Sequence, residues 1–334
     1  MTTPHMIGLP SVVQTASDRE LAVLRALGRL GAVESTVLHG LIFPGTHQTT
    51  ADRAIARLLE RGFIWMTRGP GRSTTRADGR PGPPRSQRAF GLTTDGKVVL
   101  ESLGAEAAGV TLDRLLARDR RAPPPSVLTL VGDLLISAWC ATILDQARRA
   151  PMLVGARCQT KLVTALDPES KQPLQTVGAY LELIFDPQRR TYDRPGWQVP
   201  WFDEVTPKNY PVMRFVLEVD TGRQAIPTLI LQAQTYAALQ KAGIYTKLLG
   251  DMPLPVILTL PGQRASQVIQ AWRDGWPNTP AVISSSAKAE HPEYGALWGT
   301  YSTIKDSPPQ PTFLLSSLVQ NPTNWGQITG GWQP

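Results

Sequence analysis

Residues 215 to 236 read Phe-Val-Leu-Glu-Val-Asp-Thr-Gly-Arg-Gln-Ala-Ile-Pro-Thr-Leu-Ile-Leu-Gln-Ala-Gln-Thr-Tyr, and they decide the fold class expected for the second half of the chain. The stretch opens with an apolar run that stops at Thr221-Gly222, which is typical of a buried strand followed by a turn. Pro227 suits the first turn of a helix, and apolar residues recur at helical spacing after it. The stretch therefore predicts a β-strand that leads directly into an α-helix.

Two carboxylates lie on this predicted strand, at Glu218 and Asp220. Side chains two residues apart on a strand point to the same face, so both carboxylates would meet at the carboxyl end of the strand. Such a pair could hold a hard cation, Mg²⁺ or Mn²⁺, through oxygen ligands. The alternative is that Glu218 and Asp220 line a solvated strand end and are structural. The spacing alone leaves both interpretations open.

The composition limits the classes to which the protein can belong. The chain has 334 residues, enough for two domains, and an apolar fraction of 42% that suffices for a core. A net charge of +7 favours a polyanionic partner. Cys140 and Cys158 are too few for a disulfide framework or a zinc site, and the four histidines have no metal-binding spacing. No glycine-rich phosphate loop or dinucleotide fingerprint follows a predicted strand, which argues against nucleotide hydrolases and oxidoreductases.

The sequence gives no sign of a membrane or secreted protein. The first residues lack a basic segment followed by an apolar run, so no signal peptide is expected. The most hydrophobic segment, 128 to 144, is short for a bilayer span and is interrupted by Gly132 and Asp133. We therefore expect this segment to be a buried helix, and the protein to be cytoplasmic.

Residues 15 to 104 have the pattern of a winged helix-turn-helix. Ser17-Asp18 is a favourable start for a first helix with a leucine stripe, and shorter helical patterns follow at 34 to 41 and 46 to 62. Strands are expected at 63 to 67 and 88 to 93. Three helices followed by a two-stranded hairpin are typical of this DNA-binding fold.

The third helix and the hairpin carry the predicted DNA contacts. The helix would lie in the major groove, and the hairpin loop from 69 to 87, rich in Gly, Pro and Arg, would contact phosphates through arginine forks and counterion release. The alternative is a solvated basic loop that prevents aggregation. The predicted DNA-binding residues are Gln48, Thr49, Arg53, Arg57, Arg61, Arg68, Arg72, Arg76, Arg80, Arg85 and Arg88.

The rest of the chain is expected to form a second domain. Residues 105 to 125 read as a basic, proline-rich linker, residues 126 to 300 as an α/β domain, and residues 301 to 334 as an irregular tail. In the α/β domain we expect helices at 127 to 149, 227 to 242 and 264 to 273, and strands at 152 to 155, 179 to 185, 213 to 220, 255 to 260 and 281 to 284. This order of elements looks like the restriction-endonuclease-like core, in which helices cover a mixed sheet.

The two halves together resemble one family. A winged helix that closes on Leu92-Thr-Thr-Asp-Gly96, followed by the acidic strand and by a helix with a late Tyr at Tyr236, is similar to the replication-relaxation family of plasmids and other mobile elements. The resemblance covers most of residues 15 to 245. It implies a DNA-binding protein with a nuclease-like second domain and a role in plasmid replication or mobilisation.

The chain departs from that family at two positions. Gly178 stands where the resemblance implies an Asp, and Gln232 where it implies a Lys, although Glu218 and Asp220 match the acidic pair. Metal-dependent cleavage needs carboxylates around the metal and usually a nearby lysine. Glu182 could replace the missing carboxylate, and Lys161 or Lys241 the missing lysine.

Three functions stay open at this point. We favour a binder of double-stranded DNA from a plasmid, phage or other mobile element, acting in replication initiation, mobilisation or transcription control without cleavage. The second is a metal-dependent nuclease or nickase, with Glu218, Asp220 and Glu182 as candidate catalytic residues. The third is an adaptor that docks a replisome or relaxase partner through tryptophan-rich loops.

Overall fold

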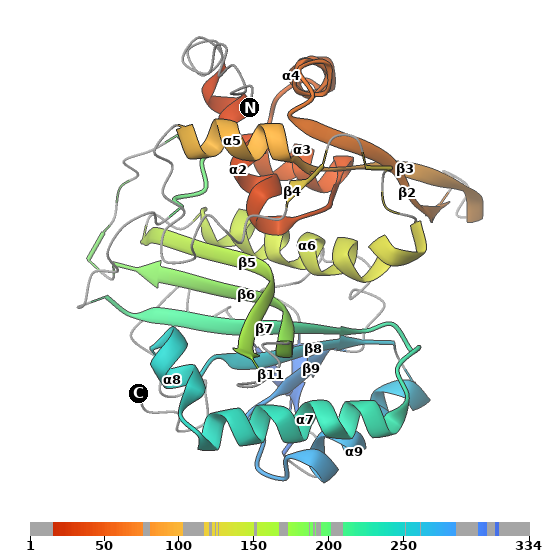
Figure 1. The fold of residues 1–334 in the computed structure, drawn as a ribbon, viewed down its shortest axis with the longest axis vertical. Helices are drawn as coiled ribbons and strands as arrows, with labels where there is room; N and C mark the ends of the chain where they lie inside the picture. The colour runs from red at the N-terminus through yellow and green to blue at the C-terminus, as the bar shows by residue number, and fades with distance from the viewer. Residues whose placement is uncertain are drawn as a thin grey trace, which may run out of the picture. The chain divides into compact units, whose positions relative to one another are not determined.

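The computed structural model (Figure 1) describes residues 16–75, 81–102, 117–119, 122–123, 125, 127–149, 152–166, 173–186, 188–189, 191, 195–201, 210–250, 252–260, 262–284, 300–305 and 311–313. These residues form helices together with antiparallel and mixed sheets, so the predicted α+β class is confirmed. The chain divides into two compact units. The first unit is Met1–Ser137 with Trp201–Thr206, and the second is Ala138–Pro200 with Pro207–Pro334.

The helices of the first unit begin and end close to where the sequence predicts. They are α2 (Asp18–Leu30), α3 (Ser35–Ile42), α4 (Gln48–Glu60) and, after the hairpin, α5 (Thr94–Ser102). Ser17 and Glu20 form a capping box at the start of α2, and Gly31 ends that helix with a φ of 73°. Leu24, Leu27 and Leu30 of the predicted stripe are buried in the core of this unit, together with Leu38 and Leu41 of α3, whereas Leu21 is half-buried.

The hairpin of the first unit corrects one expectation. Strands β2 (Ile64–Thr75) and β3 (Pro81–Thr93) pair over most of the segment that we expected to be a loop from 69 to 87. Residues 76 to 80 lie outside the described part of the chain. Gly and Pro are depleted in strands, which is why the composition indicated a loop. The outer part of the hairpin, where the prolines lie, tolerates them because β2 and β3 pair there only with each other.

Two short strands flank the base of this hairpin. β1 (Val33–Glu34) pairs with Ala89 and Phe90 of β3, and β4 (Ala117–Arg118) pairs in parallel with Leu92 and Thr93. Part of the expected linker is therefore a strand of the first unit. Most of the remaining linker lies outside the described residues.

The second unit is built on a seven-stranded mixed sheet in the order β11-β10-β9-β8-β7-β6-β5. β5, β6 and β7 are antiparallel, β8 and β9 run parallel to β7, and β10 and β11 are antiparallel again. The strands are β5 (Leu153–Leu166), β6 (Pro173–Phe185), β7 (Val212–Asp220), β8 (Leu254–Thr259), β9 (Val282–Ser284), β10 (Thr300–Thr303) and β11 (Pro311–Phe313).

The last two strands correct the expectation of an irregular tail from 301 to 334. β10 and β11 extend the sheet at one edge, while residues beyond 313 lie outside the description. Both strands are too short to show a period-two pattern in the sequence. β10 becomes a strand by pairing with β9, and β11 by pairing with β10.

Four helices complete the described part of this architecture: α6 (Val127–Ala147), which crosses the boundary between the units, α7 (Ile226–Lys241), α8 (Ile244–Leu249) and α9 (Gln263–Gly275). α7 and α9 lie side by side (Figure 1) and bury Leu229, Tyr236 and Trp272 against Tyr180 and Val216 of the sheet. None of the described helices combines the length and the apolar character that crossing a bilayer would require.

Gly275 explains how closely α7 and α9 approach each other. A Cβ atom at this position would lie 2.4 Å from the carbonyl oxygen of Ile230 in α7. Since real Cβ atoms do not come that close to a backbone oxygen, only glycine allows this helix contact.

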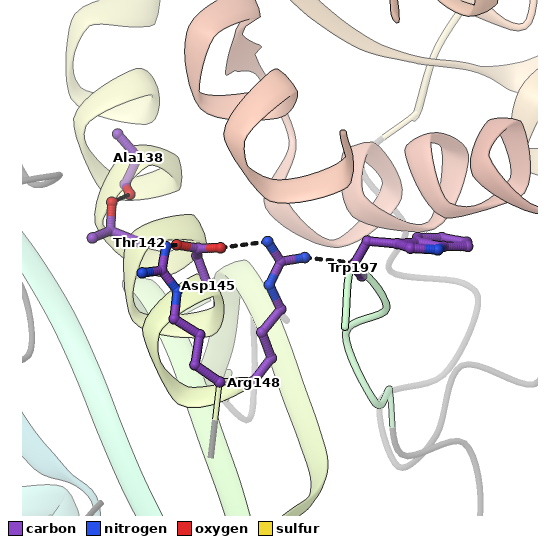
Figure 2. A network of polar contacts seen from close by, with 6 residues as sticks. Ala138, Thr142, Asp145, Arg148 and Trp197 are labelled. Atoms are coloured by element: carbon purple, nitrogen blue, oxygen red, sulfur yellow. Dashed lines mark hydrogen bonds and ion pairs between the residues drawn. The ribbon is translucent and has the colours of Figure 1, made fainter. Parts of the chain in front are cut away.

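A buried arginine joins the end of α6 to the loop from 195 to 200 (Figure 2). The Arg148 side chain is 2% exposed, and its guanidinium donates hydrogen bonds to the Trp197 carbonyl at 2.5 Å and to Asp145. Arg149 donates to the other oxygen of Asp145. Burial lowers the pKa of Arg148, and the Asp145 carboxylate opposes that effect. The loop thus depends on a desolvated cation for its position.

Replacing Arg148 with methionine should reduce the free energy of unfolding by about 2 kcal/mol, because hydrogen bonds to a charged group are lost while the apolar volume is kept. Urea denaturation measures this change. The matched control is Arg149→Met, in which an arginine that is 72% exposed and bonds to the same Asp145 is removed. Its exposed ion pair should contribute less than about 1 kcal/mol. Equal losses in the two variants would contradict this view of Arg148.

Candidate functional site

Helix α4 presents one polar face to solvent. Ala51, Ala54, Ile55 and Leu58 are buried, whereas Gln48, Thr49, Arg53 and Arg57 are exposed. His47 caps the helix by accepting a hydrogen bond from the Thr49 N–H at its Nδ1 atom. Four of the predicted DNA-binding residues therefore lie on a helix surface that can reach a partner.

Arg57 has a structural partner within the first unit. Its Nε atom donates to Oε1 of Glu20 at 2.7 Å, and the Glu20 side chain is 2% exposed while that of Arg57 is 51% exposed. Glu20 also accepts the Ser17 N–H at 2.8 Å. Burial by itself would raise the pKa of Glu20, but the bonds from Arg57 and Ser17 outweigh it and lower the pKa. Arg57 thus ties α4 to the capped start of α2.

Arg88 is paired differently. Its guanidinium donates to Oδ1 of Asp52 in α4 at 3.0 Å, and both side chains are about half exposed, at 49% and 43%. Arg88 stands opposite Arg68 in the register of β2 and β3, and Arg72 stands opposite Arg85. Like charges directly opposite each other destabilise a strand pair unless an anion balances them. Asp52 supplies such an anion for the pair of Arg88 and Arg68.

The predicted DNA-binding arginines thus fall into distinct groups. The side chains of Arg53 and Arg68 are exposed, and no ion pair or side-chain hydrogen bond joins either of them to another described residue. Arg61 follows α4 as its half-buried C-cap residue. Arg76 and Arg80 lie outside the described residues, and only the backbone positions of Arg72 and Arg85 are described.

In the second unit, Asp220 lies at the end of β7 and has both oxygens occupied by protein donors. Arg264 of α9 binds it in a bidentate manner, with Nε 2.6 Å from Oδ2 and a second nitrogen 2.7 Å from Oδ1. The Thr259 hydroxyl donates to Oδ2, and the Gly222 N–H to Oδ1. Burial alone would raise the pKa of Asp220, but these bonds, with Arg264 first, lower it. This geometry joins β7, β8 and α9.

Glu218 faces the same helices but has different partners. The residue is 9% exposed, and the Tyr236 hydroxyl donates to its Oε1 atom at 2.6 Å. The Gln232 side chain and the Gly178 backbone N–H also hydrogen bond to it. Burial raises the pKa of Glu218 to about 7, although these donors act in the opposite direction. Gly178, Gln232 and Tyr236 are the three residues compared with the replication-relaxation pattern. All three therefore lie at the Glu218 carboxyl group.

Glu182 does not join the other two carboxylates. It accepts the Tyr180 hydroxyl at 2.8 Å and lies between Arg157 and Arg214, at 3.6 and 3.9 Å. It is four residues from Gly178 along β6, which corresponds to about 13 Å of strand. Glu182 therefore cannot replace a carboxylate missing at the Gly178 position. Among the proposed replacements for the lysine, Lys161 is exposed on β5 with a φ of 54°.

Lys241 is exposed at the end of α7. Within the described ranges, no group of three or more His, Cys, Asp or Glu side chains is placed to hold a metal ion. The pair predicted to bind Mg²⁺ or Mn²⁺ consists of Glu218 and Asp220, which lie on one face of β7 as expected. Each of these carboxylates has its own protein donors.

The sequence pattern did not identify the partners of these acids. Arg264 is 44 residues from Asp220, and Glu20 is 37 residues from Arg57. Helical and strand periodicities relate residues a few positions apart, so they cannot pair groups on different elements. The capping-box spacing of Ser17 and Glu20 was the only local signal that Glu20 has a role at a helix start.

The raised pKa of Glu218 predicts a specific dependence of stability on pH. The native carboxyl binds a proton more tightly than the unfolded one, so stability should fall as the pH rises from 4.5 to about 7 and should level off above that. The full change corresponds to roughly 3 kcal/mol. Glu218→Gln should remove this part of the pH profile, as measured by urea denaturation from pH 4.5 to 8. Parallel profiles for wild type and variant would exclude Glu218 as the titrating group.

Replacing Arg264 with methionine should destabilise the protein by about 3 kcal/mol at pH 7, because the buried Asp220 carboxylate loses its cation. Denaturant titration measures the loss. Adding Asp220→Asn to Arg264→Met should recover part of it, since the uncompensated charge is then gone. The control is Arg223→Met, which removes an exposed arginine near the same turn. An Arg264 variant as stable as this control would show that the pair contributes little.

Comparisons with known proteins add no further assignment to this geometry. No protein-family model matches the chain. No curated protein and no solved structure matches it either.

Proposed function

We propose that the chain binds double-stranded DNA and serves a plasmid, phage or other mobile element in replication initiation, mobilisation or transcription control. The observation that carries this proposal is the exposed face of α4, on which Gln48, Thr49 and Arg53 project from a helix that two others support. Three helices followed by a paired hairpin support a winged helix-turn-helix with α4 as the recognition helix.

The charges of the first unit suggest how the contacts are divided. Arg53 on α4 and Arg68 on β2 are exposed cations without an acidic partner in the described structure, so they are suited to phosphate contacts. Gln48 and Thr49 lie at the start of α4, where side chains of a recognition helix reach base edges. Arg57 has a different role, since its bond to Glu20 holds α4 against α2.

For the second unit we propose a restriction-endonuclease-like fold that has been retained for binding. The order α6, antiparallel β5-β6-β7, α7 and parallel β8 supports this fold. The absence of cleavage is supported by the partners of the two acids, because Asp220 is neutralised by Arg264 and Glu218 is buried against Tyr236. With the motifs in the sequence, this arrangement supports our proposal of a replication-relaxation protein.

A salt titration tests the DNA contacts. The slope of log K against log salt concentration changes by about 0.9 for each phosphate contact. The double variant Arg53→Gln/Arg68→Gln should therefore bind a duplex of random sequence more weakly, with a slope shallower by about 2, as measured by fluorescence anisotropy. The control is Arg149→Gln, which removes an exposed arginine of the second unit. Arg148 is unsuitable as a control because its side chain is buried in a polar network. Equal slopes for the double variant and this control would refute the assigned contacts.

A plasmid assay tests the proposal for the second unit. Supercoiled plasmid incubated with the protein and Mg²⁺, Mn²⁺ or EDTA should be retarded in a gel but not nicked, because neither acid is free to bind a metal. Metal-dependent nicking that disappears in Asp220→Asn would instead show that Arg264 gives way to a metal and that the second unit is a nuclease.

A further inference from the structure

Asp52 is an acid within the surface of α4 that we propose contacts DNA. It lies next to Arg53 in the sequence and one helical turn after Gln48 and Thr49, so it belongs to the same region of the helix. Its side chain is 43% exposed and bonds Arg88 of β3 at 3.0 Å. A carboxylate at such a place opposes the approach of any phosphate.

We propose that Asp52 is a specificity-determining residue that reduces binding to DNA of arbitrary sequence. This inference depends on the proposed DNA-binding function and assigns a role to one residue of that surface. In the free protein the Asp52 carboxylate forms an ion pair with Arg88 and neutralises its charge. A non-cognate duplex therefore gains no phosphate contact from Arg88 unless it separates this pair.

The exposure of the pair makes the exchange feasible. Both Asp52 and Arg88 are about half exposed, so water and salt compete with their ion pair. The pair of Arg57 with Glu20 differs, because Glu20 is 2% exposed and is also held by Ser17. Arg88 is thus the arginine that can change partners, while Arg57 stays in place.

The chemistry of the major groove gives Asp52 a favourable partner at a correct site. A carboxylate accepts a hydrogen bond from the exocyclic amine of cytosine or adenine, whereas guanine and thymine present only acceptors to it in that groove. At a site with such an amine in the right position, Asp52 exchanges Arg88 for the amine, and Arg88 becomes available to a phosphate. At other sites Asp52 keeps Arg88 or repels the DNA.

The register of the hairpin supports the same role. Arg88 and Arg68 stand opposite each other on β3 and β2, and Asp52 reaches this pair from α4. Without the carboxylate, two like charges would face each other at the base of the ribbon. Both would then be available to phosphates of any sequence.

The test compares Asp52→Asn with Glu60→Gln by anisotropy on a 30-base-pair duplex of random sequence between 50 and 300 mM NaCl. Glu60 is an exposed acid at the other end of α4, so its variant matches the change in net charge without releasing Arg88. We expect Asp52→Asn to bind several-fold more tightly than Glu60→Gln, with a slope steeper by about 0.9, as for one added phosphate contact.

Arg88→Gln completes a double-mutant cycle. It should weaken binding by a larger factor in the Asp52→Asn background than in the wild type, because only there is Arg88 free before DNA arrives. Duplexes selected from a random pool should also be less enriched in a common sequence with Asp52→Asn than with the wild type.

Two outcomes would overturn the inference. In one, Asp52→Asn binds no more tightly than Glu60→Gln; in the other, Arg88→Gln has the same effect in both backgrounds. A wild-type protein that binds no duplex at any salt concentration would instead overturn the proposed function itself. Thermal melting of each variant checks that a change in binding is not a loss of folding.

Discussion

The second unit depends on a strand that carries two carboxylates into its interior. β7 is paired on both sides in the sheet, and its Glu218 and Asp220 lie beneath α7 and α9. A buried carboxylate is costly unless donors surround it. The unit meets this constraint with different chemistry at each acid: Arg264 neutralises Asp220, and Tyr236, Gln232 and Gly178 donate to Glu218. The packing of both helices is therefore coupled to the state of these two groups.

The ion pairs of the first unit differ, because their arginines are about half exposed. Two of its acids, Glu20 and Asp52, form ion pairs with Arg57 of α4 and Arg88 of β3. One pair fixes a helix, and the other limits the availability of a cation. Glu20 does the former, because it is buried and also accepts the Ser17 N–H. Asp52 is exposed, so its bond to Arg88 can be exchanged. The difference in burial between two similar ion pairs thus separates a structural role from a proposed recognition role.

These two arrangements together shape the proposed function. A binder of nucleic acid needs cations that are available without being uniformly attractive to phosphate. Arg53 and Arg68 supply positive charge that no acid in the described part of the chain neutralises. The positive charges of Arg57 and Arg88 are less available, because Glu20 and Asp52 pair with them. The acids of the second unit have their own protein donors. We therefore propose that this unit contributes shape and surface to binding.

The positions of the helices and of the central strands followed from the sequence by itself. Apolar periodicity, the Ser17 cap and the stop at Thr221-Gly222 are local signals, and the helices and the strands β7, β8 and β9 that they predict begin and end within a few residues of the observed ones. The expected strands at 152 to 155 and 179 to 185 are longer than predicted, because β5 continues to Leu166 and β6 begins at Pro173. The common face of Glu218 and Asp220 also followed, because a strand has a period of two.

Only the tertiary structure decided which residues these side chains meet. Pairing across the hairpin made strands of a Gly- and Pro-rich segment, and pairing with β9 and with each other made strands of β10 and β11. Arg264 reached Asp220 from 44 residues away, and Asp52 reached Arg88 from 36. Such contacts join elements that are distant in the chain, and no local spacing encodes them, since the folding of the chain brings their residues together.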